Sequence, residues 1–125
     1  MRYIEIKYNQ TRLPGGLTQE DNLDAKIKRV YVPMTETGFY ILFCLQEEMH
    51  GYNITQKVRE MTEGQVDIGP GTMYGTLGKM EKDGLIEFVR EEEKRKLYKI
   101  TPTGLEVLQL EIERIKRLYR NIRGK

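Results

Sequence analysis

The residues of this chain whose types and spacing could support chemistry lie in two short segments. The first runs from Gly69 to Lys82 and combines small hydroxyl donors, a tyrosine and lysines, whereas the second, from Glu91 to Lys96, ends in three basic residues. Hydroxyls, ammonium groups and the unpaired N–H groups of a helix N-terminus all suit phosphate oxygens. Both segments therefore have the chemistry of a surface that binds a polyanion.

Other kinds of site find little support in the sequence. Cys44 is the only cysteine, which excludes an intramolecular disulfide and a cysteine zinc cluster, and we expect it to be a packed thiol. His50 is the only histidine, and we expect its ring to hydrogen-bond the backbone at the turn before a helix. No nucleophile–base pair, phosphate loop or metal-ligand spacing appears. We therefore expect neither an enzyme nor a bound metal or cofactor.

Composition gives the class of protein. The chain has 125 residues, 38% hydrophobic and 32% charged, with a net charge of +2, which indicates one ordinary domain. Its longest apolar run, Phe39 to Leu45, is seven residues long, far below the roughly 20 that a membrane helix needs. The N-terminus lacks the apolar stretch of a signal peptide. These features predict a cytoplasmic protein without a membrane partner.

Charge is distributed unevenly. Residues 34–101 hold nine basic and twelve acidic side chains, a net of −3, and residues 102–125 hold six basic and three acidic ones, a net of +3. A polyanion-binding surface must then be a narrow positive face with an acidic back. We expect moderate, salt-sensitive affinity from such a surface.

The helices that must position these residues follow from apolar spacing and break residues. Residues 1–33 form an extension with a weak strand signal at Ile4–Tyr8 and a short helix over 19–30, capped by Thr18. Thr35 can cap a buried helix through Leu45. Two further helices show apolar residues at i, i+4 and i+7, the first at Ile54, Val58 and Met61 and the second, over 70–83, at Met73, Leu77 and Met80.

A hairpin and a long helix complete the chain. Two β-prone runs over 85–101, joined by a six-residue charged loop at 91–96, predict the hairpin. The order of three helices, a hairpin and a long helix is that of a winged helix-turn-helix, a mainly α (α+β) fold. The last helix, over 102–125, carries a heptad seam that we expect to hold a homodimer, namely Leu105, Leu108, Ile112, Ile115, Tyr119 and Ile122.

The third helix, over 70–83, would be the element that contacts the bases of DNA. Opposite its core face lie Gly71, Gly75, Gly78, Lys79 and Lys82, with Thr72 and Tyr74 on the flanks. Each mid-helix glycine costs about 1 kcal/mol relative to alanine, and close approach of a DNA backbone is one reason for that cost, helix bending another. Tyr74 either meets DNA or packs on the second helix. In the hairpin, Lys94, Arg95 and Lys96 would contact DNA, or the charged run is a solvated loop.

Several motifs together resemble one known family. Tyr31 to Thr37, His50-Gly51-Tyr52, Gly69 to Tyr74, Asp83 to Ile86 and Leu97 to Thr101 are similar, in this order, to the PadR transcriptional regulators. The resemblance covers residues 31–122 and fits the small subgroup with a single C-terminal dimerisation helix. It implies a dimeric bacterial or archaeal repressor in which Tyr52, Thr72, Tyr74 and residues 94–96 contact DNA.

Two functional hypotheses follow from the sequence. In the first, a homodimer binds double-stranded DNA at an inverted repeat, because two-fold symmetry of the protein matches two-fold symmetry of the operator. A small-molecule inducer of unknown identity could bind near Phe39, Phe43 and Tyr119. In the second, the winged helix is a protein–protein interaction module without sequence-specific DNA binding, which the net charge of −3 over residues 34–101 would suit.

Overall fold

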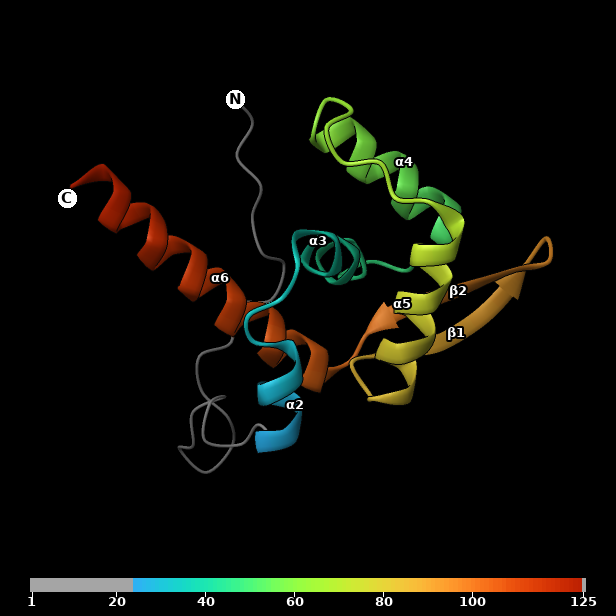
Figure 1. The fold of residues 1–125 in the computed structure, drawn as a ribbon. Helices are drawn as coiled ribbons and strands as arrows, with labels where there is room; N and C mark the ends of the chain where they lie inside the picture. The colour runs from blue at the N-terminus through green and yellow to red at the C-terminus, as the bar shows by residue number, and fades with distance from the viewer. Residues whose placement is uncertain (1–23, 125) are drawn as a thin grey trace.

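The fold is a winged helix-turn-helix with a long C-terminal helix. The computed structural model describes residues 24–124, and the structure confirms the predicted order of three helices, a hairpin and a last helix (Figure 1). The predicted strand at Ile4–Tyr8 and the Thr18 cap lie outside the described residues. The elements are α2 (Ala25–Tyr31), α3 (Glu36–Cys44), α4 (Gly51–Met61), α5 (Pro70–Lys82), β1 (Ile86–Glu92), β2 (Arg95–Ile100) and α6 (Pro102–Arg123).

The described helix before Pro33 is α2, which begins at Ala25. Asp24 is its N-cap, and the Asp24 carboxylate accepts a hydrogen bond of 2.8 Å from the Lys26 backbone N–H. This helix overlaps the predicted one over 19–30 from Ala25 onward, and the earlier part of that prediction, residues 19–23, lies outside the described residues.

The other helix starts follow the predicted chemistry. Thr35 Oγ1 accepts from the Gly38 N–H at 3.0 Å and thereby caps α3. His50 Nδ1 accepts from the Asn53 N–H at 3.3 Å, which confirms the expected backbone role of the ring at the start of α4. Proline is the first residue of both α5 and α6, where its missing N–H has no intrahelical partner to lose.

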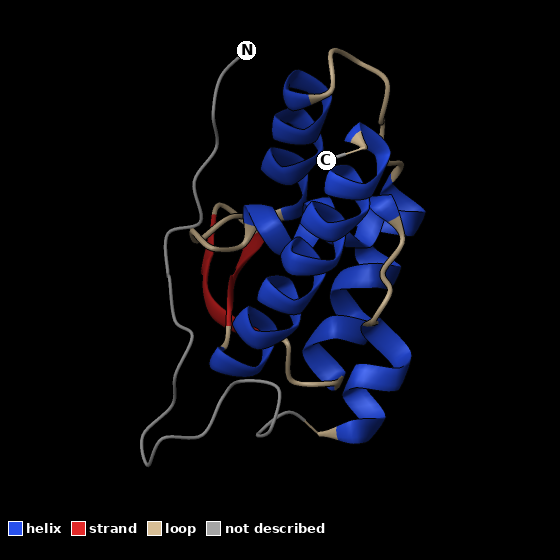
Figure 2. Ribbon diagram, turned by 90° about the vertical axis from the view of Figure 1, so that its left-hand side faces the viewer, coloured by secondary structure: helices blue, strands red, loops and turns tan. Residues whose placement is uncertain are grey.

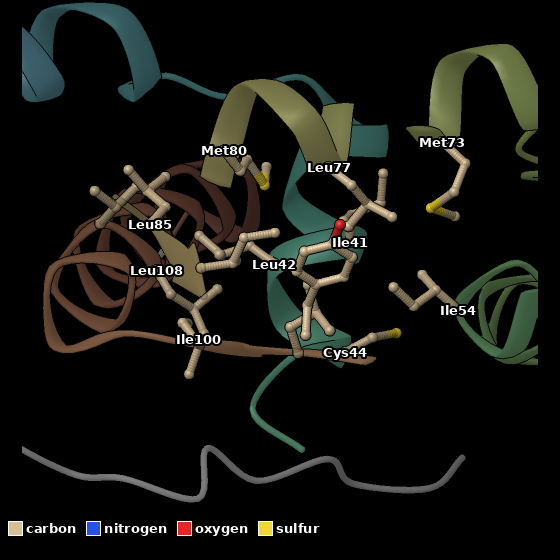
Figure 3. Close-up of a cluster of buried hydrophobic side chains, with 14 of the residues drawn as sticks. Ile41, Leu42, Cys44, Ile54, Met73, Leu77, Met80, Leu85, Ile100 and Leu108 are labelled. Atoms are coloured by element: carbon tan, nitrogen blue, oxygen red, sulfur yellow. The ribbon is translucent and has the colours of Figure 1, made fainter. Parts of the chain in front are cut away.

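The core is built around α3, whose Ile41, Leu42 and Cys44 gather with apolar side chains of the other helices and of β2 (Figure 3). Ile41 and Leu42 have no exposed surface, and the predicted inner face of α5, Met73, Leu77 and Met80, is 1% exposed at each residue. Cys44 is buried, and burial raises the pKa of its thiol to about 11, as a packed thiol requires.

The start of α6 is fixed to the connection between α5 and β1. A Cβ added at Gly104 would lie 2.1 Å from the backbone oxygen of Leu85, so only glycine fits there. The Thr101 hydroxyl donates to the Gly84 carbonyl at 2.6 Å, and the Thr101 N–H donates to the Leu85 carbonyl at 3.0 Å. The long helix therefore leaves the domain in a defined direction.

The hairpin corrects the predicted six-residue loop. The strands extend to Glu92 and from Arg95, which leaves a two-residue turn at Glu93 and Lys94, with φ of 49° and 65°. Two positive φ values are the geometry of a type I′ turn, which matches the twist of the strands. The ladder pairs Glu91 with Lys96 and Glu92 with Arg95 across the strands, so opposite charges face each other.

The base of the hairpin is joined to the segment between α3 and α4. Met49 and Tyr98 exchange two backbone hydrogen bonds of 3.0 and 3.1 Å, and the Ile100 N–H donates to the Leu45 carbonyl at 2.7 Å. The strands therefore lie along one edge of the helices (Figure 2). Within residues 24–124, the structure contains no helix with the length and apolar character needed to cross a membrane.

Candidate nucleic-acid interface

The outer face of α5 is open, as predicted. Thr72, Lys79 and Lys82 are exposed. Gly71, Gly75 and Gly78 have nothing within 4 Å of an added Cβ, and none of them has a positive φ. No contact within the described structure accounts for glycine at these positions, so a side chain could be added there without any clash inside the protein.

Tyr74 packs on the second helix, one of the two alternatives that the sequence left open, and still leaves much of its side chain exposed. Its ring edge packs on the start of α4, because a Cβ added at Gly51 would lie 3.1 Å from Tyr74 Cε1. The residue is nevertheless 59% exposed, so most of its ring faces solvent beside the outer face of α5.

Tyr52 links α4 to the wing. The Arg95 guanidinium lies 4.9 Å from the centroid of the Tyr52 ring, a cation–π contact. The Tyr52 hydroxyl accepts a hydrogen bond of 3.1 Å from Gln56 Nε2, and the His50 ring stacks on the ring at 6.4 Å. The start of α4 thus touches both α5, through Gly51 and Tyr74, and the wing, through Tyr52 and Arg95. We call the predicted DNA-contacting residues of these three elements the reading surface: Tyr52, Thr72, Tyr74, Gly75, Lys79, Lys82, Lys94, Arg95 and Lys96.

The basic residues of the wing differ in whether acidic side chains already pair with them. Arg90 binds both Glu48 and Glu92, and these hydrogen bonds, to Glu48 first, raise the pKa of its guanidinium. Lys94, Arg95 and Lys96 remain exposed at the tip. The Arg90–Glu48 pair joins the hairpin to the segment before α4.

A contact that sequence reasoning missed lies beside Lys79. The Lys79 ammonium is 3.1 Å from Asp83 Oδ2 and 5.2 Å from the centroid of the Tyr31 ring, and the Tyr31 hydroxyl donates to the same Asp83 oxygen at 2.7 Å. The hydrogen bond from Tyr31, followed by that from Lys79, lowers the pKa of Asp83, whereas burial and then Asp83 raise the pKa of Tyr31. No local pattern in the sequence could indicate the hydrogen bond between Tyr31 and Asp83, because these residues are 52 positions apart.

The seam of α6 divides into an inner and an outer part. Leu108 is fully buried in the protomer's own core, so its predicted place in a dimer interface is wrong, and Leu105 and Ile112 pack partly against that core. The outer part forms an exposed apolar face, with Ile115 41%, Leu118 46%, Tyr119 60% and Ile122 81% exposed. The heptad pattern missed Leu118, although it lies three residues after Ile115 and four before Ile122.

A buried carboxylate fixes α6 against the start of α3. Glu111 has no exposed surface and accepts a hydrogen bond of 2.8 Å from the Met34 N–H. Arg114 donates to both Glu111 oxygens at 2.9 Å, and this pairing raises the pKa of the Arg114 guanidinium. The carboxylate is thus hydrogen-bonded and paired, as a buried charge requires.

Comparison with known proteins agrees with this arrangement. A family model described as "Transcriptional regulator PadR-like family" matches residues 41–110, which is more than half of the chain. The chain belongs to the PadR-like family of transcriptional regulators. This is a family of regulators and not of enzymes, which confirms the expectation drawn from the missing catalytic groups.

Individual PadR-like relatives differ in length. The transcriptional regulator Rv3488 of Mycobacterium tuberculosis is 32% identical over 80 residues, which cover 62% of this chain and 72% of the relative. The transcriptional regulator YqjI of Escherichia coli is 25% identical over 80 residues, 64% of this chain and 39% of YqjI. An uncharacterised transposon protein of Streptomyces fradiae is 30% identical over 70 residues, 20% of its length. The chain thus spans well under half of the latter two relatives.

Solved structures confirm the winged-helix fold of this PadR-like chain. A transcriptional regulator from Clostridium thermocellum is 27% identical, with a TM-score of 0.62 over 82% of this chain and 96% of that one. A PadR family regulator from Clostridium difficile is 25% identical, with a TM-score of 0.63 over 72% and 97%. Bacillus subtilis PadR in complex with operator DNA is 28% identical, with a TM-score of 0.53 over 62% and 46%.

Proposed function

We propose that this PadR-like regulator is a homodimeric repressor that binds an operator in double-stranded DNA through its reading surface. One observation carries the proposal: the exposed faces of α5, the start of α4 and the wing are contiguous, with cations at both ends and an open glycine strip between them. The structural relative that was solved with operator DNA supports it. We place its site of action in the cytoplasm, where bacterial and archaeal DNA lies.

Each element of the reading surface has a role in this proposal. Helix α5 enters the major groove, where Lys79 and Lys82 meet base edges or phosphates and Gly75 lets the helix backbone come close. Thr72, in the first turn of α5, donates to a phosphate. Tyr52 and Tyr74 offer hydroxyls to the DNA backbone, and the wing cations Lys94, Arg95 and Lys96 contact the flanking backbone or minor groove.

The partner in the dimer is a second copy of the chain. The exposed apolar face of α6, formed by Ile115, Leu118, Tyr119 and Ile122, packs on its counterpart, with support from Leu105 and Ile112 at its inner end. Two-fold symmetry then places two α5 helices on successive turns of one DNA face, about 34–36 Å apart, so the operator is an inverted repeat. An inducer bound near Phe39 and Phe43 acts by favouring a dimer whose α5 spacing does not match DNA.

Charge reversal tests the reading surface. The probe is DNA from upstream of the chain's own gene, with scrambled DNA of equal length as control, and the readout is fluorescence anisotropy. Lys79→Glu and Arg95→Glu should abolish preferential binding, while light scattering shows the same oligomeric state as for the unchanged protein. Lys57→Glu, on the exposed side of α4 and outside the reading surface, is the matched control. Undiminished DNA binding by both reading-surface variants would contradict the proposal and favour a protein-docking module.

A further inference from the structure

Helix α2 touches the reading surface through Tyr31. The Tyr31 side chain is only 7% exposed and lies beneath the Lys79 ammonium, with 5.2 Å between the Lys79 nitrogen and the ring centroid. Asp83 completes the contact, because one of its oxygens accepts from the Tyr31 hydroxyl at 2.7 Å and from Lys79 at 3.1 Å. A ring and a carboxylate thus hold one lysine of α5 from two sides.

Lys82 lies on the same face of α5 and provides a comparison. It is exposed and makes no hydrogen bond or salt bridge within the described structure, although its charge also helps to lower the pKa of Asp83. An unrestrained lysine is a mobile point charge that can follow a phosphate. An ammonium held at one place presents its remaining donors in a fixed direction, which is what recognition of a base edge requires. The two lysines therefore differ in what they can recognise, although they share charge and helix face.

We propose that Tyr31 and Asp83 are positioning residues that fix the Lys79 ammonium for a base edge in the major groove, which makes α2 part of the reading surface. The base edge has two acceptors in line, as guanine N7 and O6 do. Lys82, by contrast, contacts phosphate. This inference rests on the proposed DNA-binding function and assigns a role in specificity within it.

Charge and shape at the site favour a base contact for Lys79 over a phosphate contact. The Asp83 carboxylate offsets the Lys79 charge locally, which weakens attraction to phosphate and leaves directional hydrogen bonding as the main contribution. A shallow recess of about 320 Å³, lined by Tyr31, Gly75, Thr76 and Lys79 among others, leaves space beside the ammonium. With Gly75 lacking a side chain there, an incoming base pair can reach the Lys79 donors.

Selection of preferred sequences from a random-sequence duplex library tests the proposal on the full chain. The variants are Tyr31→Phe, which removes the hydroxyl and keeps the ring, Asp83→Asn, Lys79→Ala and the control Lys82→Ala. We expect the unchanged protein to prefer one base pair in each half-site by about tenfold through this contact. A tenfold preference is near the lower end of the discrimination that a single side chain–base contact provides. Tyr31→Phe, Asp83→Asn and Lys79→Ala should all lose preference at that same base pair.

The control should behave differently. Lys82→Ala should weaken binding to every duplex alike and reduce the salt dependence by about one counterion, while the selected sequence stays the same. The double variant Tyr31→Phe with Lys79→Ala should be no worse than Lys79→Ala alone, because a positioning residue acts only through the residue it positions. A merely structural role of Tyr31 would instead lower affinity without changing the preferred base.

The outcomes separate this inference from the proposed function. If Lys79→Ala loses the preference but Tyr31→Phe and Asp83→Asn select the same sequence as the unchanged protein, the positioning role is wrong and DNA recognition by α5 stands. If the unchanged protein selects no sequence at all, both proposals fall. Circular dichroism should show Tyr31→Phe and Asp83→Asn fully folded at the temperature and pH of the selection, so that a lost base preference reports recognition and not unfolding.

Discussion

Replacing Gly75 by alanine should move stability and DNA binding in opposite directions. Gly75 lies in the middle of α5 with an ordinary helical backbone, and an added Cβ meets nothing within 4 Å. Alanine should therefore stabilise the helix by about 1 kcal/mol. For a chain of 125 residues that corresponds to a rise in Tm of about 4 °C. If α5 lies against DNA at this point, the new methyl group takes space that DNA needs, at a cost of about 1–3 kcal/mol in binding.

The assay pairs thermal unfolding with fluorescence anisotropy on the preferred duplex. Gly75→Ala should unfold at a higher temperature and bind DNA roughly 5- to 150-fold more weakly. Gly64→Ala is the matched control, because Gly64 lies outside α5 and has a φ of 82°, which strains any other residue. The control should lower Tm and leave DNA affinity unchanged. A Gly75→Ala variant that is more stable and binds DNA as well as the unchanged protein would refute close approach of DNA at Gly75.

Four further outcomes are expected. Ile115→Asp should give folded monomers by light scattering, because Ile115 is 41% exposed in the protomer, and a surviving dimer would contradict the assigned face of α6. Tyr52→Leu should weaken binding to all duplexes at least as much as Arg95→Ala, whereas Tyr52→Phe should weaken it less, since it loses the hydroxyl contact with the DNA backbone but keeps the ring under the guanidinium. Gly104→Ala should cost about 3 kcal/mol or more in chemical unfolding, because the Cβ would lie 2.1 Å from a backbone oxygen. The pKa of Asp83 lies below its ordinary value of 3.8, so the stability that this carboxylate contributes is fully present above pH 3.8 and is lost as pH falls through the lowered pKa; Asp83→Asn should flatten this part of the stability–pH curve.

Local chemistry made most of the fold predictable. Thr35, His50 and Thr101 all cap helices through short-range hydrogen bonds, which depend on neighbours three residues away. Apolar spacing likewise identified the inner face of α5. Residues four positions apart lie on the same side of a helix, and Met73 and Leu77, which have this spacing, are both buried. These features need no knowledge of the rest of the chain, and the structure agrees with them.

Three features of the structure depended on tertiary context. The hairpin turn is two residues long because Glu92 faces Arg95 in the ladder, and a run of charges does not show where pairing stops. Leu108 and Ile115 occupy equivalent heptad positions, yet one is buried in the core and the other is exposed, since only the first half of α6 packs on α3. The contact of Tyr31 with Asp83 joins distant segments and leaves no periodic signal in the sequence.

The most direct test of the account is equilibrium binding of the purified protein to DNA from upstream of its own gene, measured by anisotropy at two salt concentrations against scrambled DNA of equal length. The account predicts sub-micromolar, salt-dependent binding with a clear preference for the native DNA and a stoichiometry of one dimer per inverted repeat. Equal, weak binding to both duplexes, together with no enriched sequence in a selection from random duplexes, would contradict it.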